Sequence, residues 1–341
     1  MDTPETVLIF GATGQDGAYL TQILSERKCR LIGTCQNTST SDIWRLDYLG
    51  VRDAISLETC VLADAEQIGD IIRRHQPDKV FNLAGVTSLG EADADAMATR
   101  QINRDAVGVM MDTLFSEQPQ ARFFQASSAQ VFGKPDIVPQ TELTPINPLN
   151  VYAQAKVEAD NLVENARDDG YFAVSGLLYN HESPLRTSRF VSRKIVSGIV
   201  GLLEPNAEPF RIGSLNSVRD WSFARDIMLA ADLSLRAQQP NSYILASGQA
   251  HTVRDWVEIA LQEVGFVFHW QGEGLDERAV CGRTGRTLVG IDPRFYRTDD
   301  PATLIGDASR ARSELNWKPE FSFDELVKHM VAAELQRSGR S

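Results

Sequence analysis

The chain has 341 residues, with 46 acidic and 34 basic side chains and a formal net charge of -12 at pH 7. Its hydrophobic fraction of 43% and charged fraction of 23% are ordinary for a globular protein. This length is enough to bury a large core and to form two domains. Because no basic block offsets the acidic total, we expect no nucleic acid as the main partner.

The cysteine pattern and the length of the apolar runs indicate the cellular compartment to expect. The four cysteines are scattered and include no C-x-x-C pair, and the five histidines lack metal-ligand spacing. This pattern fits free thiols in a reducing cytosol better than disulfides or a zinc site. No apolar run approaches about 20 residues, and strand-like sequence starts by residue 7. We therefore expect a cytoplasmic protein without a metal site, membrane span or signal peptide.

The chain begins with a strand-like run and a glycine turn. VLIF (7–10) is followed by Gly11, Gly14 and Gly17, and then by AYLTQIL with apolar residues at helical spacing. Such a strand, turn and helix N-terminus let the backbone approach a pyrophosphate, whose charge the helix dipole favours. Any tight strand–helix turn also suits glycine, so the motif alone is weak evidence. Its place at the start of the chain, where a dinucleotide fold would begin, favours a dinucleotide site.

Strand-like and helix-like segments alternate through the first half. The helical segments include AEQIGDIIRRHQ and RDAVGVMMDTLFSEQ. The alternation predicts an α/β protein with a Rossmann-type, doubly wound parallel sheet covered on both faces. Further strands are predicted at CRLIGTC (29–35), KVFNLAG (79–85), ARFFQASS (121–128) and FAVSGLLYN (172–180).

The alternation loosens after residue 180, and residues 271–306 are expected to be largely irregular. SYILAS (242–247) looks like a return to the first sheet. We therefore expect a cofactor-binding domain made of residues 1–180 and about 214–247. A smaller substrate-binding domain would comprise about 181–213 and 248–341.

A serine, a tyrosine and a lysine are placed as a catalytic group would be. Tyr152 and Lys156 are four residues apart in a segment of helical period, so both lie on one helix face. A nearby ammonium is expected to lower the pKa of the phenol, which could then exchange a proton with a sugar hydroxyl or carbonyl. Ser128 ends a predicted strand, where parallel sheets place their ligands. The alternative for Tyr152 and Lys156 is an ordinary amphipathic pair.

These segments resemble a known family. GATGQDG, NLAG, SS-x-x-x-FG and YAQAK resemble the extended short-chain dehydrogenase/reductases. More specifically, GQDGAYL, QASSAQVFGK, LLYNHESP, RFVSRKI, VRDWSFARD, DPRFYR and IGD…LNWKPEFSFDELVKHMV are similar to GDP-mannose 4,6-dehydratases, over residues 7 to about 332. The resemblance implies a Rossmann domain, a C-terminal nucleotide-sugar domain, NADP(H) as cofactor and a GDP-hexose as substrate. We also expect a homodimer or homotetramer.

Carried over by position, the resemblance implies roles for individual residues. Ser128, Tyr152 and Lys156 would be catalytic. The cofactor would contact Gly11, Thr13, Gly14, Gln15, Asp16, Gly17, Asn37, Arg45, Leu83, Ala84, Tyr152, Lys156 and His181. The nucleotide sugar would contact Thr87, Ser128, Gln130, Asn180, Glu182, Val191, Lys194, Arg219 and Arg297. Three of these could neutralise a diphosphate, although a single basic residue is more often a solvated surface charge: Lys194, Arg219 and Arg297.

The sequence departs from the dehydratases at one catalytic position. Their glutamate, which removes the C5 proton and helps expel the C6 hydroxyl, corresponds here to Gln130. A glutamine amide has no titrating proton and cannot act as a general base or acid near pH 7. We therefore predict an NADPH-dependent reductase of a GDP-linked 4-keto-6-deoxyhexose. The alternatives are the dehydratase itself with another base such as Glu91 or Asp93, a nucleotide-sugar 4-epimerase, and a non-enzymatic nucleotide-sugar binder.

The adenosine end also departs from the family. Gln36 and Asn37 replace its arginine pair, and no acid ends the second strand to read an unphosphorylated ribose. Hydroxyl side chains and Arg45 follow closely and could contact a 2′-phosphate. This predicts a preference for NADP(H) over NAD(H).

Overall fold

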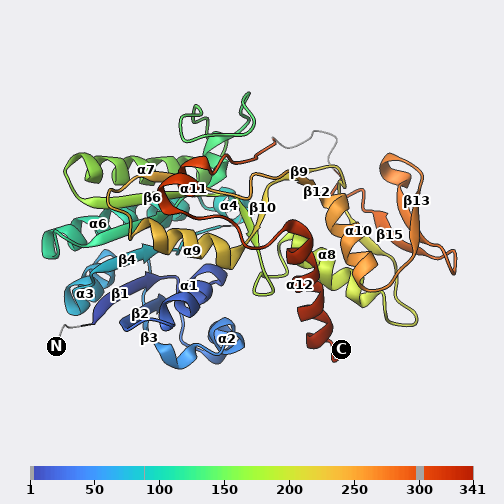
Figure 1. The fold of residues 1–341 in the computed structure, drawn as a ribbon, viewed down its shortest axis with the longest axis horizontal. Helices are drawn as coiled ribbons and strands as arrows, with labels where there is room; N and C mark the ends of the chain where they lie inside the picture. Colours follow the sequence, from blue (N-terminus) through green and yellow to red (C-terminus); the bar gives the residue numbers. More distant parts are fainter. Residues whose placement is uncertain (1–3, 88, 297–302, 341) are drawn as a thin grey trace.

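A seven-stranded parallel sheet forms the centre of the protein (Figure 1). The computed structural model describes residues 4–87, 89–296 and 303–340. The α/β class and the doubly wound parallel sheet predicted from the alternation are confirmed. The strands, in spatial order, are β11 (Ser242–Leu245), β6 (Phe172–Leu178), β5 (Arg122–Ala126), β4 (Lys79–Asn82), β1 (Glu5–Phe10), β2 (Cys29–Cys35) and β3 (Ile55–Thr59).

Helices cover both faces of this sheet because the successive side chains of Val7 to Phe10 in its central strand, which point to opposite faces, are all apolar. On β1, Val7 and Ile9 belong to one buried cluster, whereas Leu8 and Phe10 belong to another. The first cluster lies under α1 (Gln15–Ser25) and α9 (Ala224–Ser234), with α2 (Thr40–Tyr48) beside α1. The second lies under α3 (Ala65–His75), α6 (Ala106–Glu117) and α7 (Val151–Asp168).

A second unit lies beside the C-terminal ends of these strands (Figure 1). Its helices α8 (Val191–Gly201), α10 (Val253–Glu263) and α12 (Phe323–Arg337) pack on one another. Next to them is a four-stranded sheet in the order β13 (Phe268–Gln271), β14 (Arg278–Cys281), β15 (Thr287–Ile291) and β8 (Phe210–Ile212). Most of the described residues between 271 and 306 lie outside helices and strands, as predicted, but the sequence did not reveal β14 and β15 within this range. These strands are short and separated by polar, glycine-containing turns, so no long periodic run marks them.

The remaining elements are short. β7 (Asn180–Glu182) pairs in parallel with β10 (Trp221–Phe223), and β9 (Val218–Arg219) pairs in antiparallel with β12 (His251–Thr252). The short helical elements are η1 (Arg52–Ala54), α4 (Leu89–Ala94), α5 (Ala96–Arg100), the π-helix η2 (Gln101–Asp105), η3 (Ala129–Phe132), η4 (Gly274–Asp276) and α11 (Ser309–Leu315). Within the described ranges, no helix is both long and apolar enough to cross a membrane.

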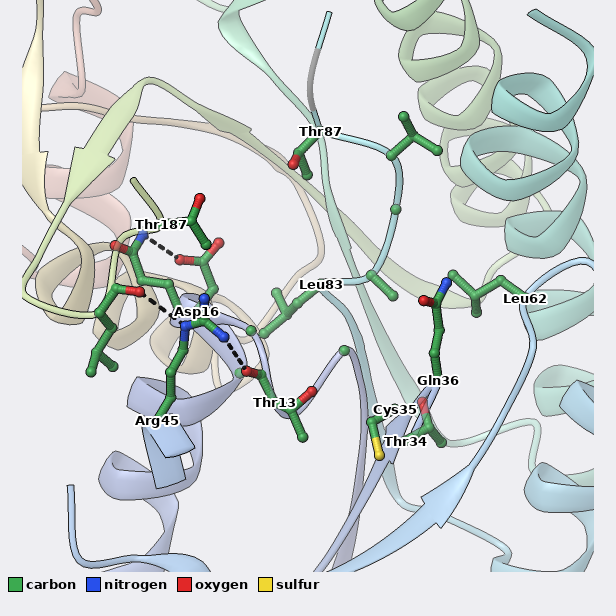
Figure 2. Close-up of a pocket in the computed structure, with 18 of the residues that line it drawn as sticks. Thr13, Asp16, Thr34, Cys35, Gln36, Arg45, Leu62, Leu83, Thr87 and Thr187 are labelled. Carbon is green, nitrogen blue, oxygen red and sulfur yellow. Dashed lines mark hydrogen bonds between the residues drawn. The ribbon is translucent and has the colours of Figure 1, made fainter. Parts of the chain in front are cut away.

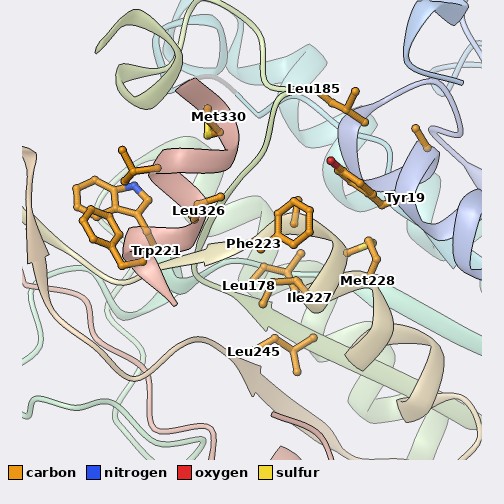
Figure 3. Packing of buried hydrophobic residues seen from close by; sticks show 14 of the residues in the cluster. Tyr19, Leu178, Leu185, Trp221, Phe223, Ile227, Met228, Leu245, Leu326 and Met330 are labelled. Carbon is orange, nitrogen blue, oxygen red and sulfur yellow. The ribbon is translucent and has the colours of Figure 1, made fainter. Parts of the chain in front are cut away.

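The two units share one apolar core (Figure 3). Phe223 stands at the centre, with its ring 5.3 Å from that of Tyr19 on α1 and 4.5 Å from that of Phe321. Leu326 and Met330 of α12 extend the same cluster into the second unit. Burial of this area couples the position of the second unit to the central sheet.

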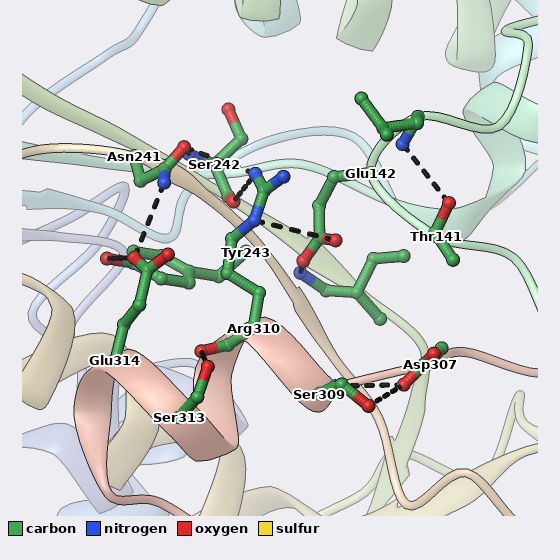
Figure 4. A network of polar contacts seen from close by, with 12 residues as sticks. Thr141, Glu142, Asn241, Ser242, Tyr243, Asp307, Ser309, Arg310, Ser313 and Glu314 are labelled. Atoms are coloured by element: carbon green, nitrogen blue, oxygen red, sulfur yellow. Dashed lines mark hydrogen bonds and ion pairs between the residues drawn. The ribbon is translucent and has the colours of Figure 1, made fainter.

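A polar network fastens α11 and the loop before α7 to the edge strand β11 (Figure 4). The Glu142 carboxylate accepts a hydrogen bond from the Ile244 backbone amide (2.9 Å) and lies 3.8 Å from the Arg310 guanidinium. The Tyr243 hydroxyl donates to Glu314 of α11 (3.0 Å). These contacts hold residues distant in sequence along one sheet edge.

Candidate active site

The glycine turn between β1 and α1 is too tight for side chains. Gly11 has φ +84°, and a Cβ there would lie 3.0 Å from Ala84. A Cβ on Gly17 would lie 2.3 Å from the Gly11 carbonyl oxygen. Gly14 caps α1 without a side-chain hydrogen bond. The turn therefore presents backbone at the N-terminus of a helix, which suits a pyrophosphate.

A cavity of about 620 Å³ opens beside this turn (Figure 2). It is bounded by the turn, the end of β2, the loop after β4 and the segment 185–190. Tyr152, Lys156 and His181 are not among its lining residues. The predicted cofactor and sugar residues that line it are Gly11, Thr13, Gly14, Gln15, Asp16, Gly17, Asn37, Arg45, Leu83, Ala84 and Thr87.

The charge around this cavity is positive although the chain is acidic. Three arginines line it, Arg45, Arg186 and Arg189, against one carboxylate, Asp16. Arg45 donates to the carbonyl oxygens of Leu185 (2.9 Å) and Thr13 (3.1 Å), and Figure 2 shows it bent over the turn. Cavity size, glycine turn and charge all fit a phosphorylated dinucleotide.

Arg186 and Arg189 were not predicted from the sequence. Their signal is the cluster of basic residues that directly follows the NHESP segment. At the end of β2 the lining residues are Thr34, Cys35 and Gln36, and none of these is acidic. Ser41 is one of the hydroxyl residues that follow β2, and its side chain lies outside the described residues.

An ion pair joins the glycine turn to β7. Nδ1 of His181 donates to the Tyr179 carbonyl oxygen (2.7 Å), and Nε2 donates to the Asp16 carboxylate (3.0 Å). Because both ring nitrogens face acceptors, this geometry favours the imidazolium form of the ring. Burial opposes that charge, but Asp16 raises the pKa of His181. Burial also opposes the Asp16 charge, yet His181 lowers the pKa of Asp16 to about 2. His181 thus holds the start of α1 through Asp16, although His181 itself does not line the cavity.

Tyr152 and Lys156 both lie on α7, as their spacing predicts, and both are buried. Lys156 Nζ donates to the Ala126 carbonyl oxygen at the end of β5 (2.7 Å) and lies 5.9 Å from the centroid of the Tyr152 ring. Ser128 lies two residues beyond β5, where it caps η3, and its side chain hydrogen-bonds Tyr152. The three side chains therefore meet at the C-terminal edge of the sheet.

The predicted direction of the Tyr152 pKa is wrong in the protein alone. Burial raises the pKa of Tyr152, while the Ser128 hydrogen bond and the Arg186 charge oppose the rise. Burial also lowers the pKa of Lys156 to about 8, opposed by the charge of Asp160. Burial of both groups, which the spacing did not reveal, outweighs the expected lysine effect.

Gln130 lies in η3, directly after Ser128, and is partly buried. Its backbone amide donates to the Ser128 hydroxyl (3.2 Å). Of the two carboxylates considered as replacements, Asp93 is exposed and the Glu91 side chain lies outside the described residues.

The other predicted sugar residues lie near β7, α8 and β9. The Glu182 carboxylate accepts from the Ser192 hydroxyl (2.6 Å) and pairs with Arg186 (3.0 Å), so it is engaged within the protein. Asn180 begins β7, Val191 and Lys194 are exposed on α8, and Arg219 lies on β9. Arg297 lies outside the described residues.

Asn103 is a further buried residue that the sequence did not single out. Its side-chain amide donates to the Val86 carbonyl oxygen (3.0 Å) and accepts from the Val86 amide (2.9 Å). It lies in the π-helix η2, and Val86 lines the cavity. Asn103 thus fixes the loop after β4 against the site.

Comparison with known proteins identifies relatives along nearly the whole chain. A family model described as GDP-mannose 4,6 dehydratase matches residues 8–330. A "GDP-mannose 4,6 dehydratase" of Dictyostelium discoideum is 34% identical over 344 residues, covering 97% of this chain and 96% of the relative. A human protein of the same name is 34% identical over 354 residues, covering 98% and 93%.

Solved structures share the fold at low sequence identity. The dTDP-glucose 4,6-dehydratase of Bacillus anthracis, in complex with NAD, has a TM-score of 0.79 and 15% identity and covers 98% of each chain. The RMD protein of Pseudomonas aeruginosa, complexed with NADPH, has a TM-score of 0.76 and 19% identity and covers 98% of this chain and 99% of its own. This likeness establishes the Rossmann-type fold.

Proposed function

The chain belongs to the GDP-mannose 4,6-dehydratase family, and on that premise we propose that it is a nicotinamide-dependent enzyme acting on a GDP-linked hexose. The observation that carries the proposal is the meeting of Ser128, Tyr152 and Lys156 at the sheet edge, beside a dinucleotide-sized cavity. We also propose the two-domain division and the homodimer or homotetramer expected from the sequence.

We propose NADP(H) as the cofactor. The absence of an acid among the lining residues at the end of β2 and the position of Arg45 over the turn support NADP(H) over NAD(H). When bound, the nicotinamide supplies or accepts a hydride. The glycine turn would hold its pyrophosphate, and Arg45 would face the adenosine phosphate.

Each catalytic side chain then has one task. The Tyr152 hydroxyl exchanges a proton with the oxygen at the reacting sugar carbon, and Ser128 hydrogen-bonds the same oxygen. Lys156 keeps a positive charge beside Tyr152 and thereby favours the phenolate when the proton leaves. Closure of the site by the sugar and the cofactor would exclude water from this exchange.

The names of the relatives favour 4,6-dehydration as the reaction, over the reductase that Gln130 alone predicts. Dehydration needs a group that removes the C5 proton, and Gln130 cannot be that group. This observation keeps reduction of a GDP-linked 4-keto-6-deoxyhexose as the second candidate. Dehydration and reduction act on different GDP-sugars and give different products, so product analysis distinguishes them.

Product analysis decides between the candidates. The protein is mixed with GDP-mannose and NADP⁺, and separately with GDP-4-keto-6-deoxymannose and NADPH. The dehydratase predicts loss of water from GDP-mannose by mass spectrometry, whereas the reductase predicts NADPH oxidation only with the keto sugar. Gln130→Glu should raise dehydration if the missing carboxylate limits it. Inactivity of wild type and variant with both sugars would contradict the proposal.

Cofactor preference is measured separately by quenching of protein fluorescence during titration with each dinucleotide. Tighter binding of NADPH than of NADH is expected. Tighter binding of NADH would contradict the proposed role of Arg45. Replacing Arg45 with Met should weaken NADPH binding more than NADH binding if the guanidinium faces the 2′-phosphate.

A further inference from the structure

Asp160 is a partly buried acid that the proposed chemistry does not use. It lies on α7 one helical turn after Lys156, on the side of the helix that faces the sheet. Its two carboxylate oxygens accept from different segments of the chain. One accepts a short hydrogen bond from Ser127, and the other accepts from Ser175 of β6 (2.8 Å).

These contacts fix the backbone directly before Ser128. Lys156 holds the Ala126 carbonyl oxygen (2.7 Å), and Asp160 holds the hydroxyl of Ser127. The Ser127 amide also donates to the Gly176 carbonyl oxygen of β6 (2.8 Å). Two side chains of α7, one turn apart, therefore hold the two residues that precede Ser128. The helix that carries Tyr152 is thus attached to the segment that carries its partner serine.

We propose that Asp160 is a positioning residue of the active site, which holds Ser128 in register with Tyr152 through Ser127 and supplies the counter-charge of Lys156. The proposal rests on the proposed function, because it assigns Ser128, Tyr152 and Lys156 to proton exchange. No contact of Asp160 with substrate or cofactor is implied.

The charged groups around Lys156 support the proposal that Asp160 supplies its counter-charge. Among the residues that the structure describes, the charge of Asp160 raises the pKa of Lys156, which burial lowers to about 8. The charge of Arg167, farther along α7, lowers the pKa of Asp160. The charge of Arg186 lowers the pKa of Tyr152, whereas the charges of Asp160 and Asp16 raise it. Ser127, directly after β5, and Ser175 of β6 donate hydrogen bonds from their hydroxyls to Asp160.

The role of Asp160 as counter-charge is tested by measuring the titration of Lys156 directly. In protein labelled with 15N-lysine, the Lys156 signal is assigned with Lys156→Arg and titrated with pH by NMR. Asp160→Asn should lower the midpoint by about one pH unit, because an opposite charge this close favours the ammonium. Asp160→Glu should return the midpoint toward wild type. An unchanged midpoint in Asp160→Asn would overturn this part of the proposal.

The positioning role is tested with a matched serine pair. Ser127→Ala and Ser175→Ala each remove one hydroxyl from Asp160, but only Ser127 adjoins Ser128. We expect Ser127→Ala to lower kcat roughly tenfold or more with little change in KM, since small misplacements of catalytic groups are costly. Ser175→Ala should stay near wild type. Equal kcat in the two variants would overturn the positioning role.

The two proposals fail in different ways. If wild-type protein turns over neither GDP-sugar, the proposed function fails, while the NMR titration still tests the link between Asp160 and Lys156. If wild type is active and the Asp160 and Ser127 variants match it in both kcat and Lys156 midpoint, only the positioning role fails. If Asp160→Asn does not fold, the serine pair and Asp160→Glu provide the test.

Discussion

Tyr152 is the residue whose burial most directly affects the proposed proton exchange. It is 9% exposed, and its hydroxyl bonds Ser128 at the edge of the sheet. Burial disfavours the phenolate, so the free protein keeps Tyr152 protonated, ready to donate a proton to a carbonyl oxygen. In the opposite direction, removal of a sugar hydroxyl proton by Tyr152 depends on the positive charge of Lys156.

Tyr152→Phe should lower turnover by roughly 10²-fold or more, which is the scale of general acid–base catalysis. The ring remains, so binding of the GDP-sugar should be retained. Steady-state kinetics and calorimetric binding together check this expectation. Tyr179→Phe is the matched control, because its hydroxyl bonds Gln140 away from the site (3.0 Å). Near-normal turnover in Tyr152→Phe would give the tyrosine a structural role only.

Residue spacing predicts which side chains share a helix face, but not what surrounds them. The four-residue interval places Tyr152 and Lys156 together on α7. The pairing of His181 with Asp16 depends on β7 lying beside the glycine turn, a contact between residues far apart in sequence. Local pattern carries no information on such contacts.

At the scale of elements, the start of α1 is defined by glycines that pack against backbone. Gly17→Ala would place a methyl group 2.3 Å from the Gly11 carbonyl oxygen and 2.5 Å from Ala12. Since the obstacles are backbone atoms, the turn itself must shift, and we expect loss of dinucleotide binding in a fluorescence titration. Gly201→Ala is the control, because no atom lies within 4 Å of the added methyl. Wild-type affinity in Gly17→Ala would contradict this account.

The ion pair between α1 and β7 predicts a pH dependence of stability. The pKa of His181 is raised above its usual 6.5, so its contribution is present below pH 6.5 and is lost as pH rises through the higher folded value. The pKa of Asp16 falls from 3.8 to about 2, so its contribution is present above pH 3.8 and is lost toward pH 2. The pair therefore stabilises the fold most between about pH 4 and 6.5.

His181→Asn should accordingly lower Tm most near pH 5, with a smaller difference from wild type above pH 8. Scanning calorimetry across this range measures the difference. The exposed His269, changed to Asn in the same way, serves as control. A Tm difference that is the same at pH 5 and pH 9 would exclude the ion pair as its cause.

Most strands of the central sheet are predicted from sequence, including the four-residue β4 and β11, whereas β3 and several strands outside this sheet are not. The predicted strand at 29–35 matches β2 (Cys29–Cys35), whereas β3 and the strands β13 to β15 are missed. The latter have four or five residues each, and their register comes from pairing across the sheet. The π-helix η2 was not predicted either, and its residue Asn103 contacts the loop after β4, which is distant in sequence.

At the scale of the whole molecule, a single carboxylate joins three distant segments. Asp220, between β9 and β10, is fully buried. It accepts from the amide (2.9 Å) and hydroxyl (2.6 Å) of Ser247, and from the amides of Gly248 (2.8 Å) and Gly306 (3.2 Å). Gly248 follows the edge strand β11, and Gly306 precedes α11. Asp220 thus ties the turn between β9 and β10 to the segment after the edge strand β11 and to the segment before α11.

Asp220→Ala should lower the free energy of unfolding by about 3 kcal/mol, because it removes a charged acceptor and leaves several buried donors without it. Asp220→Asn should be nearly as costly, since its amide nitrogen would face donors. Urea denaturation measures both changes. Asp136→Ala, which removes an exposed carboxylate, should stay within about 0.5 kcal/mol of wild type. A free energy of unfolding for Asp220→Asn equal to that of wild type would contradict this account. The backbone amides would then have other acceptors, and the carboxylate would not be what joins the segments.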